Sequence, residues 1–333
     1  MARIVRFHAF GGPGALRLDE LEVGEPGPGE VRIRVGAFGL NRVEAYFRAG
    51  EFMPPGQLPS TIGYEAAGVI EAVGPGVSEW RPGDRVATLF GLEMDRYGTN
   101  GEMILYPADM LVAVPPGQSL TQAAASWMQY GTAYGLIDVG QIAAGDTVVI
   151  NAASSSVGLA AIQIARAEDA LPIAITRTRD KADALLAQGA AHVIVSDEED
   201  VPARIMEITG GAGTRLAFDA VAGAPLADLL SAMAPRGTVI VYGMLGGFSF
   251  ELMLPVLMLG NLALHGFSAD RLIRDPTDRA HMIGYVSRGL ASGALSPVID
   301  STFDISQVAE AHGRLESNRQ LGKIVVTTQS AGE

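Results

Sequence analysis

The stretch GDTVVINAASSSVGLAAIQIA, at residues 145–165, decides the fold of this chain. It contains an apolar run of strand length at 148–150 and continues into a turn of Ala and Ser residues. The segment from Val157 then places small and apolar side chains at helical spacing. The stretch therefore predicts a buried strand, a tight turn and a helix that packs closely on a sheet.

Apolar runs of strand length recur along the chain after this stretch and alternate with helical segments. Such alternation predicts βαβ units on a doubly wound parallel sheet, so the fold class is α/β. The predicted strands are 148–150, 173–175, 193–195, 216–218, 239–241 and 262–264.

The first 120 residues differ from the rest of the chain in their Gly and Pro content. Clusters of Gly and Pro, such as GEPGPG at 24–29, separate short β-rich runs such as VRIRV at 31–35. This part predicts an irregular, mostly antiparallel β domain. The alternation stops after residue 266, where a helix at 282–293 and a strand at 323–327 are expected. We expect this tail to rejoin the first domain.

The turn after the first parallel strand has the chemistry of a phosphate site. A pyrophosphate is bound where side chains are small and where the N–H groups of a helix start face the anion. The G-x-G-x-x-G positions read Ala153, Ser155 and Gly158, so only the last glycine is kept. The alternative is a tight strand-to-helix connection of the kind found in any α/β domain.

Cations follow the second parallel strand, where an enzyme that uses NAD would place Asp or Glu. The chain has Thr176, Arg177, Thr178 and Arg179 there, followed by Lys181. Arginines suit a 2′-phosphate and favour NADPH over NADH. An exposed position at a helix start is the better interpretation of Lys181.

Composition excludes several classes of protein. The 333 residues carry 24 Lys and Arg against 37 Asp and Glu, and the net charge of −13 disfavours nucleic acid. No cysteine is present, so disulfides, Cys-ligated zinc and a thiol nucleophile are excluded. The longest apolar run, 252–264, is too short for a bilayer span. We expect a soluble, cytoplasmic protein with no membrane partner.

The chain as a whole resembles the medium-chain dehydrogenase/reductase superfamily, in its zinc-free quinone oxidoreductase (zeta-crystallin-like) branch. The resemblance implies a GroES-like catalytic domain at 1–121 and 267–333, a Rossmann NADP-binding domain at 122–266, a cleft between them and a homodimer. It rests on GLNRVEAYFRAG (39–50), LPSTIGYEAAGVIEAVGPGV (58–77), RPGDRV (81–86), YGTAY (130–134), LLAQGAAHVI (185–194) and GKIVV (322–326).

Zinc alcohol dehydrogenases of the superfamily hold a metal with a Cys-His-Cys type triad. Asn41, Tyr64 and Met128 stand at those positions here, and Glu65 cannot hold zinc alone. We therefore expect no metal site. Each of the five histidines is expected at the surface or at a strand end rather than as a ligand: His8, His192, His265, His281 and His312.

Without zinc as a Lewis acid, oxidation of a simple alcohol is disfavoured. A quinone or an enone is itself electrophilic and accepts hydride with hydrogen-bond polarisation and a proton. The resemblance implies Asn41, Tyr46 and Tyr64 as candidate catalytic residues. For Tyr64 and Tyr130, packing with a satisfied hydroxyl is an equal alternative. The implied contacts to NADPH are Asn41, Tyr46, Tyr130, Thr132, Ser155, Ser156, Val157, Gly158, Thr176, Arg177, Arg179, Tyr242, Gly243, Phe267, Arg319 and Lys323.

Three other functions stay open from the sequence. An enoyl-thioester reductase is disfavoured because Phe52 aligns with a tyrosine of many relatives, and a phenyl ring donates no proton. An alcohol dehydrogenase would need the metal. A protein that binds NADPH without catalysis, in a structural or regulatory role, is the alternative from another class.

Overall fold

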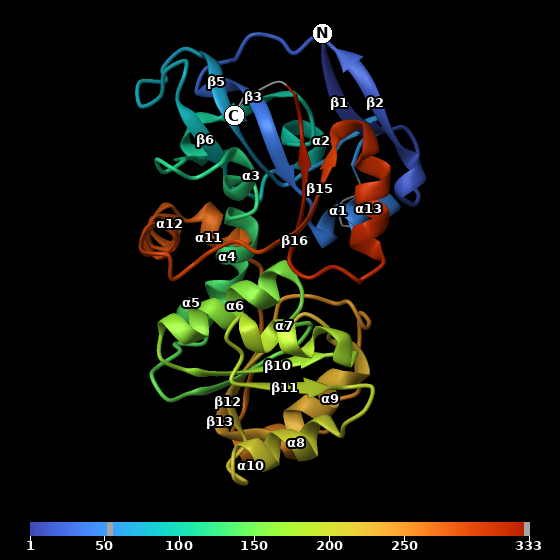
Figure 1. Ribbon diagram of the computed structural model, residues 1–333, viewed down its shortest axis with the longest axis vertical. Helices are drawn as coiled ribbons and strands as arrows, with labels where there is room; N and C mark the ends of the chain where they lie inside the picture. The colour runs from blue at the N-terminus through green and yellow to red at the C-terminus, as the bar shows by residue number, and fades with distance from the viewer. Residues whose placement is uncertain (52–55, 330–333) are drawn as a thin grey trace. The chain divides into compact units, whose positions relative to one another are not determined.

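The computed structural model describes residues 1–51 and 56–329, and the chain forms two compact units (Figure 1). Unit 1 consists of Met1–Met128 and the segment that begins at Pro297, and unit 2 consists of Gln129–Ser296. The residue Phe52, on which the sequence disfavours a thioester reductase, lies outside the described residues.

Unit 2 is built on a six-stranded parallel sheet with the order β11-β10-β9-β12-β13-β14. This confirms the predicted doubly wound fold. Strands β9 to β13 begin one to six residues before the predicted ranges, and β14 begins one residue after its predicted start. The strands are β9 (Thr147–Ile150), β10 (Leu171–Thr176), β11 (His192–Val195), β12 (Thr214–Asp219), β13 (Met233–Val241) and β14 (Ala263–Gly266).

Helices cover both faces of this sheet because its central strands are apolar on both sides. Helices α6 and α7 lie on one face, and α8, α9 and α10 lie on the other (Figure 1). On the second face, Val149, Ile173 and Val239 pack against Ile205 and Leu226. The helices are α5 (Gly135–Asp138), α6 (Ser156–Ala167), α7 (Ala182–Ala187), α8 (Val201–Ile208), α9 (Gly223–Ser231), α10 (Leu254–Gly260), α11 (Asp270–Arg274) and α12 (Pro276–Ser292).

Unit 1 is mostly antiparallel β structure, as its turn-rich sequence predicts. Its larger sheet has the order β15-β16-β3-β5-β6-β8, with β7 paired to β3, and the smaller sheet has the order β2-β1-β4. The strands are β1 (Ala2–Phe7), β2 (Leu16–Leu21), β3 (Glu30–Gly39), β4 (Ser60–Thr61), β5 (Glu65–Val73), β6 (Arg85–Thr88), β7 (Met103–Pro107), β8 (Leu111–Ala113), β15 (Ile299–Asp304) and β16 (Lys323–Thr327).

The C-terminal segment completes the larger sheet of unit 1. Strand β16 pairs antiparallel with β3, with Val325 opposite Gly39, so the tail rejoins the first domain as expected. The helices of unit 1 are α1 (Arg42–Ala49), α2 (Met94–Tyr97), α3 (Leu120–Ala123) and α13 (Val308–Glu316), and α4 (Trp127–Ala133) carries the chain from unit 1 into unit 2.

The borders between the units differ from the expected ones. They fall after residues 128 and 296, whereas the sequence placed them after 121 and 266. The second border is later because α11 and α12 pack within unit 2. Arg271 of α11 forms an ion pair with Asp138, and the Tyr285 hydroxyl of α12 donates to Glu168 at 2.8 Å.

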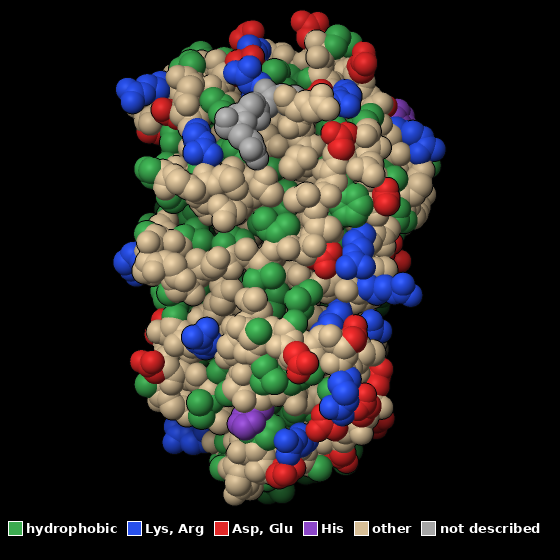
Figure 2. Space-filling view, in the orientation of Figure 1, with side chains coloured by type: hydrophobic (Ala, Val, Ile, Leu, Met, Phe, Trp, Pro, Cys, Tyr) green, Lys and Arg blue, Asp and Glu red, His purple; other side chains and the backbone are tan. Residues whose placement is uncertain are grey.

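The surface mixes the two signs of charge. Figure 2 shows acidic and basic side chains interspersed on the face in view rather than gathered by sign. Within the described residues, no helix combines the length and apolar character needed to cross a bilayer.

Candidate functional site

The predicted phosphate turn joins β9 to α6. Ser155 is the N-cap of α6, and its Oγ accepts from the Gly158 N–H at 3.0 Å. A Cβ at Gly158 would lie 2.6 Å from both the Cα and the carbonyl oxygen of Ala153. This contact explains why Gly158 is the one glycine kept, since it lets the helix start pack against the strand end. N–H groups at a helix start favour an anion, so the turn has the local geometry that the sequence predicts for a phosphate site.

The cations after β10 differ in their contacts. Thr176 is buried, and Arg177 is exposed at the strand end. Arg179 is exposed and forms an ion pair with Glu198, with Nε 2.9 Å from Oε2. The Lys181 ammonium donates to Ser154 Oγ, in the turn itself, at 3.2 Å. Lys181 therefore lies at the predicted phosphate site, which the interpretation as an exposed helix-start cation missed.

A buried polar pair, Asn151 and Asp219, lies at the carboxyl ends of β9 and β12. The sequence analysis did not identify it. Asn151 donates to Asp219 Oδ1 at 2.8 Å, and the Ala222 N–H donates to Oδ2 at 2.6 Å. Burial raises the pKa of Asp219 above its usual range. Polar residues at the carboxyl ends of parallel strands are the signal that was available for both.

Tyr242 follows β13 and stacks on Phe218, with 4.1 Å between the ring centroids. Its hydroxyl oxygen is buried and has no hydrogen-bond partner of good geometry among the described residues. Burial raises the pKa of the phenol, and the Asp219 carboxylate raises it further. The side chain that faces this hydroxyl is Ser155, the N-cap of α6, so Tyr242 lies against the predicted phosphate turn.

Four other residues of unit 2 that the resemblance implies as NADPH contacts pack mainly against the protein itself. The Tyr130 hydroxyl is fully buried and donates to Gln163 Oε1 at 2.6 Å, so packing with a satisfied hydroxyl describes it. Thr132 is buried in α4. Phe267 packs on Gly135, where a Cβ would lie 2.9 Å from the ring, and a Cβ at Gly243 would lie 2.6 Å from the Ala220 carbonyl oxygen.

A buried ion pair forms the centre of the site in unit 1. The Lys323 ammonium pairs with Glu65 Oε1 and donates to Asn41 Oδ1 at 2.6 Å. Both charged side chains are 1% exposed. Glu65 Oε2 accepts from the Met128 N–H at 3.0 Å. Gly39 leaves room for the pair, since a Cβ there would lie 2.6 Å from Lys323 Cε.

Glu44 is a second buried carboxyl beside Asn41, and the sequence did not identify it. Asn41 is the N-cap of α1 and Glu44 is its third residue, so the spacing N-x-x-E of a capping box was the available signal. Glu44 Oε2 also accepts from Asn100 Nδ2 at 2.9 Å. Burial raises the pKa of the Glu44 carboxyl to about 7.

The expectation that His312 lies at the surface or at a strand end is wrong. His312 is fully buried in α13, and its Nδ1 accepts from Arg48 Nη1 at 2.8 Å. Burial lowers the pKa of His312 to about 3, and the Arg48 charge acts in the same direction. His312 is therefore neutral at physiological pH. The amphipathic pattern of α13 could have indicated its burial.

The remaining predicted residues of unit 1 differ in exposure. Tyr46 is half-buried in α1, and burial raises the pKa of its phenol. Tyr64 is buried directly before Glu65. Arg319 is exposed between α13 and β16. Of the residues predicted for unit 1, the structure thus brings Asn41 and Lys323 into direct contact.

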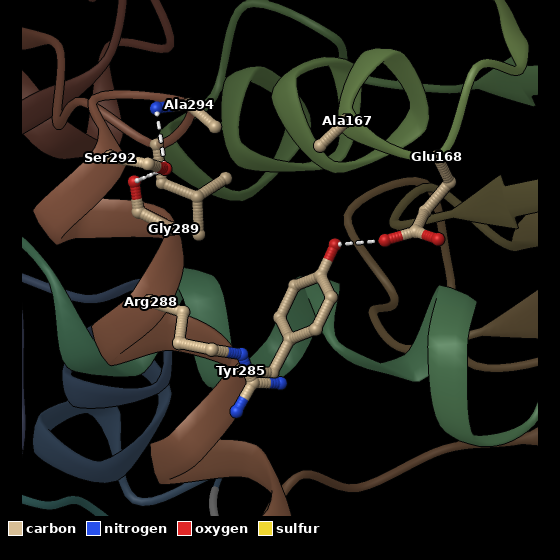
Figure 3. A pocket seen from close by; sticks show the side chains of 8 residues that line it. Ala167, Glu168, Tyr285, Arg288, Gly289, Ser292 and Ala294 are labelled. Carbon is tan, nitrogen blue, oxygen red and sulfur yellow. Dashed lines mark hydrogen bonds between the residues drawn. The ribbon is translucent and has the colours of Figure 1, made fainter.

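A hollow in unit 2 lies apart from the phosphate turn. It is lined by the end of α6 and by α12, and the hydrogen bond from Tyr285 to Glu168 crosses it (Figure 3). The twelve-residue helix α6 separates it from Ser155 by roughly 18 Å. The hollow is therefore no part of the predicted nucleotide site.

Comparison with known proteins defines the class. The domain description "Alcohol dehydrogenase GroES-like domain" matches residues 27–116, and "Zinc-binding dehydrogenase" matches residues 188–326. The second match contains none of the zinc-triad positions. Asn41 and Tyr64 fall within the first match, and Met128 falls between the two. The chain is an oxidoreductase with a GroES-like and a Rossmann-like domain.

Full-length relatives narrow the class. Quinone oxidoreductase of Pseudomonas aeruginosa is 32% identical over 98% of this chain and 99% of its own length. The 2-haloacrylate reductase of a Burkholderia species is 30% identical over 99% of both chains. A crystal structure of Escherichia coli quinone oxidoreductase in complex with NADPH has a TM-score of 0.90 at 29% identity, covering 98% of this chain and 100% of that one. The chain belongs to the medium-chain dehydrogenase/reductase superfamily, in its quinone oxidoreductase-like branch.

Proposed function

We propose that the protein is a zinc-independent, NADPH-dependent oxidoreductase that transfers hydride to a quinone or to the β-carbon of an α,β-unsaturated carbonyl compound. The observation that carries the proposal is the buried Lys323 ammonium, which binds Glu65 and Asn41. The names of the relatives, quinone oxidoreductase and 2-haloacrylate reductase, support both acceptor classes.

The donor set in unit 1 does not fit a catalytic zinc ion. None of the side chains at the triad positions is anionic, and the neighbouring Glu65 already binds the chain's own cation. A divalent ion beside Lys323 would meet a like charge in a buried site, where repulsion is strong. Asn41, the neutral oxygen donor nearby, also accepts from Lys323.

The residues of unit 2 fit a dinucleotide phosphate. Ser155, Ser156, Val157 and Gly158 would hold the pyrophosphate at the start of α6. Arg177, Lys181 and Arg179 would hold the 2′-phosphate, with Thr176 beneath them. The buried Tyr242 hydroxyl, which faces Ser155 of the turn, places a further polar group at this end of the sheet. The resemblance implies contacts near the nicotinamide end of the cofactor for Asn41, Tyr46, Tyr130, Thr132, Tyr242, Gly243 and Phe267. It implies further cofactor contacts for Arg319 and Lys323, and a catalytic role for Tyr64.

The chain's own residues would polarise the acceptor. When bound, NADPH supplies a hydride, which with one proton converts a quinone to a hydroquinone or an enone to a saturated carbonyl compound. A phenol is protonated at neutral pH, and burial raises the pKa of Tyr46 further. A neutral phenol can donate a hydrogen bond to the carbonyl oxygen, where negative charge develops. The Lys323 ammonium is neutralised by Glu65, so its part here is to fix the Asn41 amide through the hydrogen bond to Oδ1.

The test is a matrix of cofactors and acceptors measured on protein of known metal content. We expect turnover of NADPH with small quinones or enones, insensitive to chelator, and no stoichiometric zinc. Bound zinc that supports alcohol oxidation would instead establish the alcohol dehydrogenase. Turnover restricted to enoyl thioesters would favour that reductase, and tight NADPH binding with no turnover across the panel would favour a structural or regulatory role.

Arg177 is expected to contribute most to the preference for NADPH. Arg177→Ala should raise the KM for NADPH by about tenfold and leave the KM for NADH unchanged, because one charged hydrogen bond to the 2′-phosphate is lost. The matched variant Arg179→Ala should have a smaller effect, since Glu198 already binds that guanidinium. Steady-state kinetics with both cofactors measures this. An unchanged KM for NADPH in Arg177→Ala would remove Arg177 from the site.

We also propose that the protein is a homodimer joined through α10 and β14. Strand β14 is the last strand in the order of the described sheet. The neighbouring segment exposes large apolar side chains, with Met258 73% and Leu259 86% exposed. Apolar patches of this kind mark interfaces, and a two-fold axis would let two copies cover them for each other.

Light scattering after size-exclusion chromatography tests the dimer. Wild type should elute with about twice the chain mass of 34.8 kDa. Leu259→Glu should shift the protein to the monomer, because the interface would bury a charge without a partner. Leu186→Glu, which changes an exposed leucine on α7, should leave the dimer intact. A wild-type monomer would refute the interface.

A further inference from the structure

Glu44 makes more contacts than a helix cap requires. It is fully buried, and its two carboxylate oxygens accept from three groups. Oε1 accepts from the Asn41 N–H at 2.9 Å and from Asn41 Nδ2 at 3.2 Å, and Oε2 accepts from Asn100 Nδ2 at 2.9 Å. The capping box of the Asp304 turn, by contrast, uses Gln307, which is exposed.

The contacts of the Asn41 amide fix which way it points. Oδ1 accepts from the Lys323 ammonium, and Nδ2 donates to Glu44 and to the Gly39 carbonyl oxygen at 3.1 Å. In the flipped orientation, the NH2 group would face the ammonium and the amide oxygen would face the carboxylate. Both contacts would be repulsive, so Glu44 and Lys323 together select one orientation.

His312 of α13 faces Glu44 without a hydrogen bond to it. His312 Nε2 lies 3.8 Å from Glu44 Oε2. Since the Arg48 guanidinium only donates, His312 Nδ1 must accept, and the ring proton therefore lies on Nε2, toward Glu44. Arg48 is itself buried, donates to the Gly11 carbonyl oxygen at 3.0 Å and pairs with Glu316. The hydrogen bonds from Asn41 and Asn100 hold the carboxylate in place, and the neutral His312 ring closes its α13 side.

We propose that Glu44 is a positioning residue for the reaction: its buried carboxylate holds the Asn41 amide in the orientation that offers Oδ1 to Lys323. The inference rests on the proposed function, in which Asn41 contacts the nicotinamide end of the cofactor. Glu44 touches neither cofactor nor substrate in this proposal, and its effect on catalysis passes through Asn41.

A double-mutant cycle tests the proposal, with kcat measured for NADPH and 1,4-benzoquinone. Asn41→Ala and Glu44→Ala should each lower kcat by about tenfold, because misplacing a positioned group costs rate. The double variant should lose about tenfold and not a hundredfold, since both changes remove the same interaction. The proposal would be overturned if the two losses in kcat multiplied in the double variant. An unchanged kcat in Glu44→Ala would also overturn it.

Two further variants separate positioning from folding. Gln307→Ala removes the corresponding residue of an exposed capping box and should leave kcat unchanged. If Glu44→Ala fails to fold, Glu44→Gln takes its place. Its amide oxygen can still accept from Asn41, so it should retain kcat within about threefold. A loss in Glu44→Gln as large as that in Asn41→Ala would count against positioning by hydrogen bonds.

A second measurement needs no turnover. It follows the side-chain amide resonance of Asn41 by NMR, and this resonance is identified by its absence in Asn41→Ala. Glu44 ionises at about pH 7, so this resonance should shift with pH around neutrality in wild type and not in Glu44→Gln. The charged or titratable groups facing Glu44 are Lys323 from β16 and His312 from α13, with Arg48 behind the histidine. His312 stays neutral throughout, because its pKa is about 3.

The resonance experiment also distinguishes two kinds of failure. If the protein turns over no quinone or enone, the proposed function fails, and the pH-dependent shift still shows whether Glu44 controls the Asn41 amide. If turnover is found but the Asn41 resonance shifts with pH in Glu44→Gln as it does in wild type, the positioning role fails and the proposed function stands.

Discussion

Replacing Lys323 with Met should lower the free energy of unfolding of unit 1 by about 3–5 kcal/mol, because the change leaves the Glu65 carboxylate buried without its partner. Both side chains are 1% exposed, so water cannot replace the lost ammonium without rearrangement. The variant also removes the hydrogen bond to Asn41. Urea unfolding followed by the fluorescence of Trp80 and Trp127 measures the effect, since both tryptophans belong to unit 1.

Two variants serve as controls for this loss. Lys323→Met combined with Glu65→Gln should recover most of the stability, because a buried pair replaced as a whole costs little. Arg81→Met breaks the exposed pair of Arg81 with Asp84 and should cost less than about 1 kcal/mol. A loss below that value for Lys323→Met would mean that water reaches the Glu65 carboxylate. The charge pair would then no longer argue against a metal ion at this position.

The Rossmann-like sheet could be predicted because its information is local. Each strand is a short apolar run, and Ser155 and Gly158 mark the turn to α6 within four positions of each other. The cations after β10 could be found for the same reason. Their individual contacts could not, because Arg179 pairs with Glu198 from the loop after the next strand and Lys181 reaches back to Ser154.

The site of unit 1 depends on contacts that no local pattern contains. Asn41 and Lys323 are 282 positions apart, and they meet because β16 pairs with the end of β3. The burial of His312 likewise depends on α13 packing on α1 through Arg48. The family resemblance implied a separate cofactor contact for Asn41 and for Lys323. The structure joins the two residues in one cluster with Glu65 and Glu44.

The position of the second border shows the same limit. The residues of α12 have a helical pattern, and that pattern was recognised, but amphipathicity does not tell which domain a helix covers. Arg271 and Tyr285 decide this through their bonds to Asp138 and Glu168 of unit 2. Such pairs between distant segments become visible only once the chain is folded.

Gly158→Ala should weaken NADPH binding by about tenfold to a hundredfold, because overpacking by one methyl group costs about 1–3 kcal/mol. The added Cβ would lie 2.6 Å from the Ala153 Cα and carbonyl oxygen, and backbone atoms cannot move aside as a flexible side chain does. The start of α6 must therefore shift away from the turn. That shift moves the helix N–H groups, which would hold the pyrophosphate, and it strains the bond from Gly158 to Ser155 Oγ.

Isothermal titration with NADPH measures this effect, and Gly284→Ala provides the matched substitution. Gly284 lies inside α12, where the nearest atom to an added Cβ is the end of the Arg288 side chain at 3.3 Å. That variant should leave the NADPH affinity unchanged and stabilise the protein by about 0.5–1 kcal/mol, since alanine is the better helix former. Wild-type affinity in Gly158→Ala would place the pyrophosphate elsewhere than at the start of α6. The turn would then be only a tight connection between β9 and α6. The contact of Lys181 with Ser154 would no longer place that ammonium at a phosphate, and the preference for NADPH would rest on Arg177 alone.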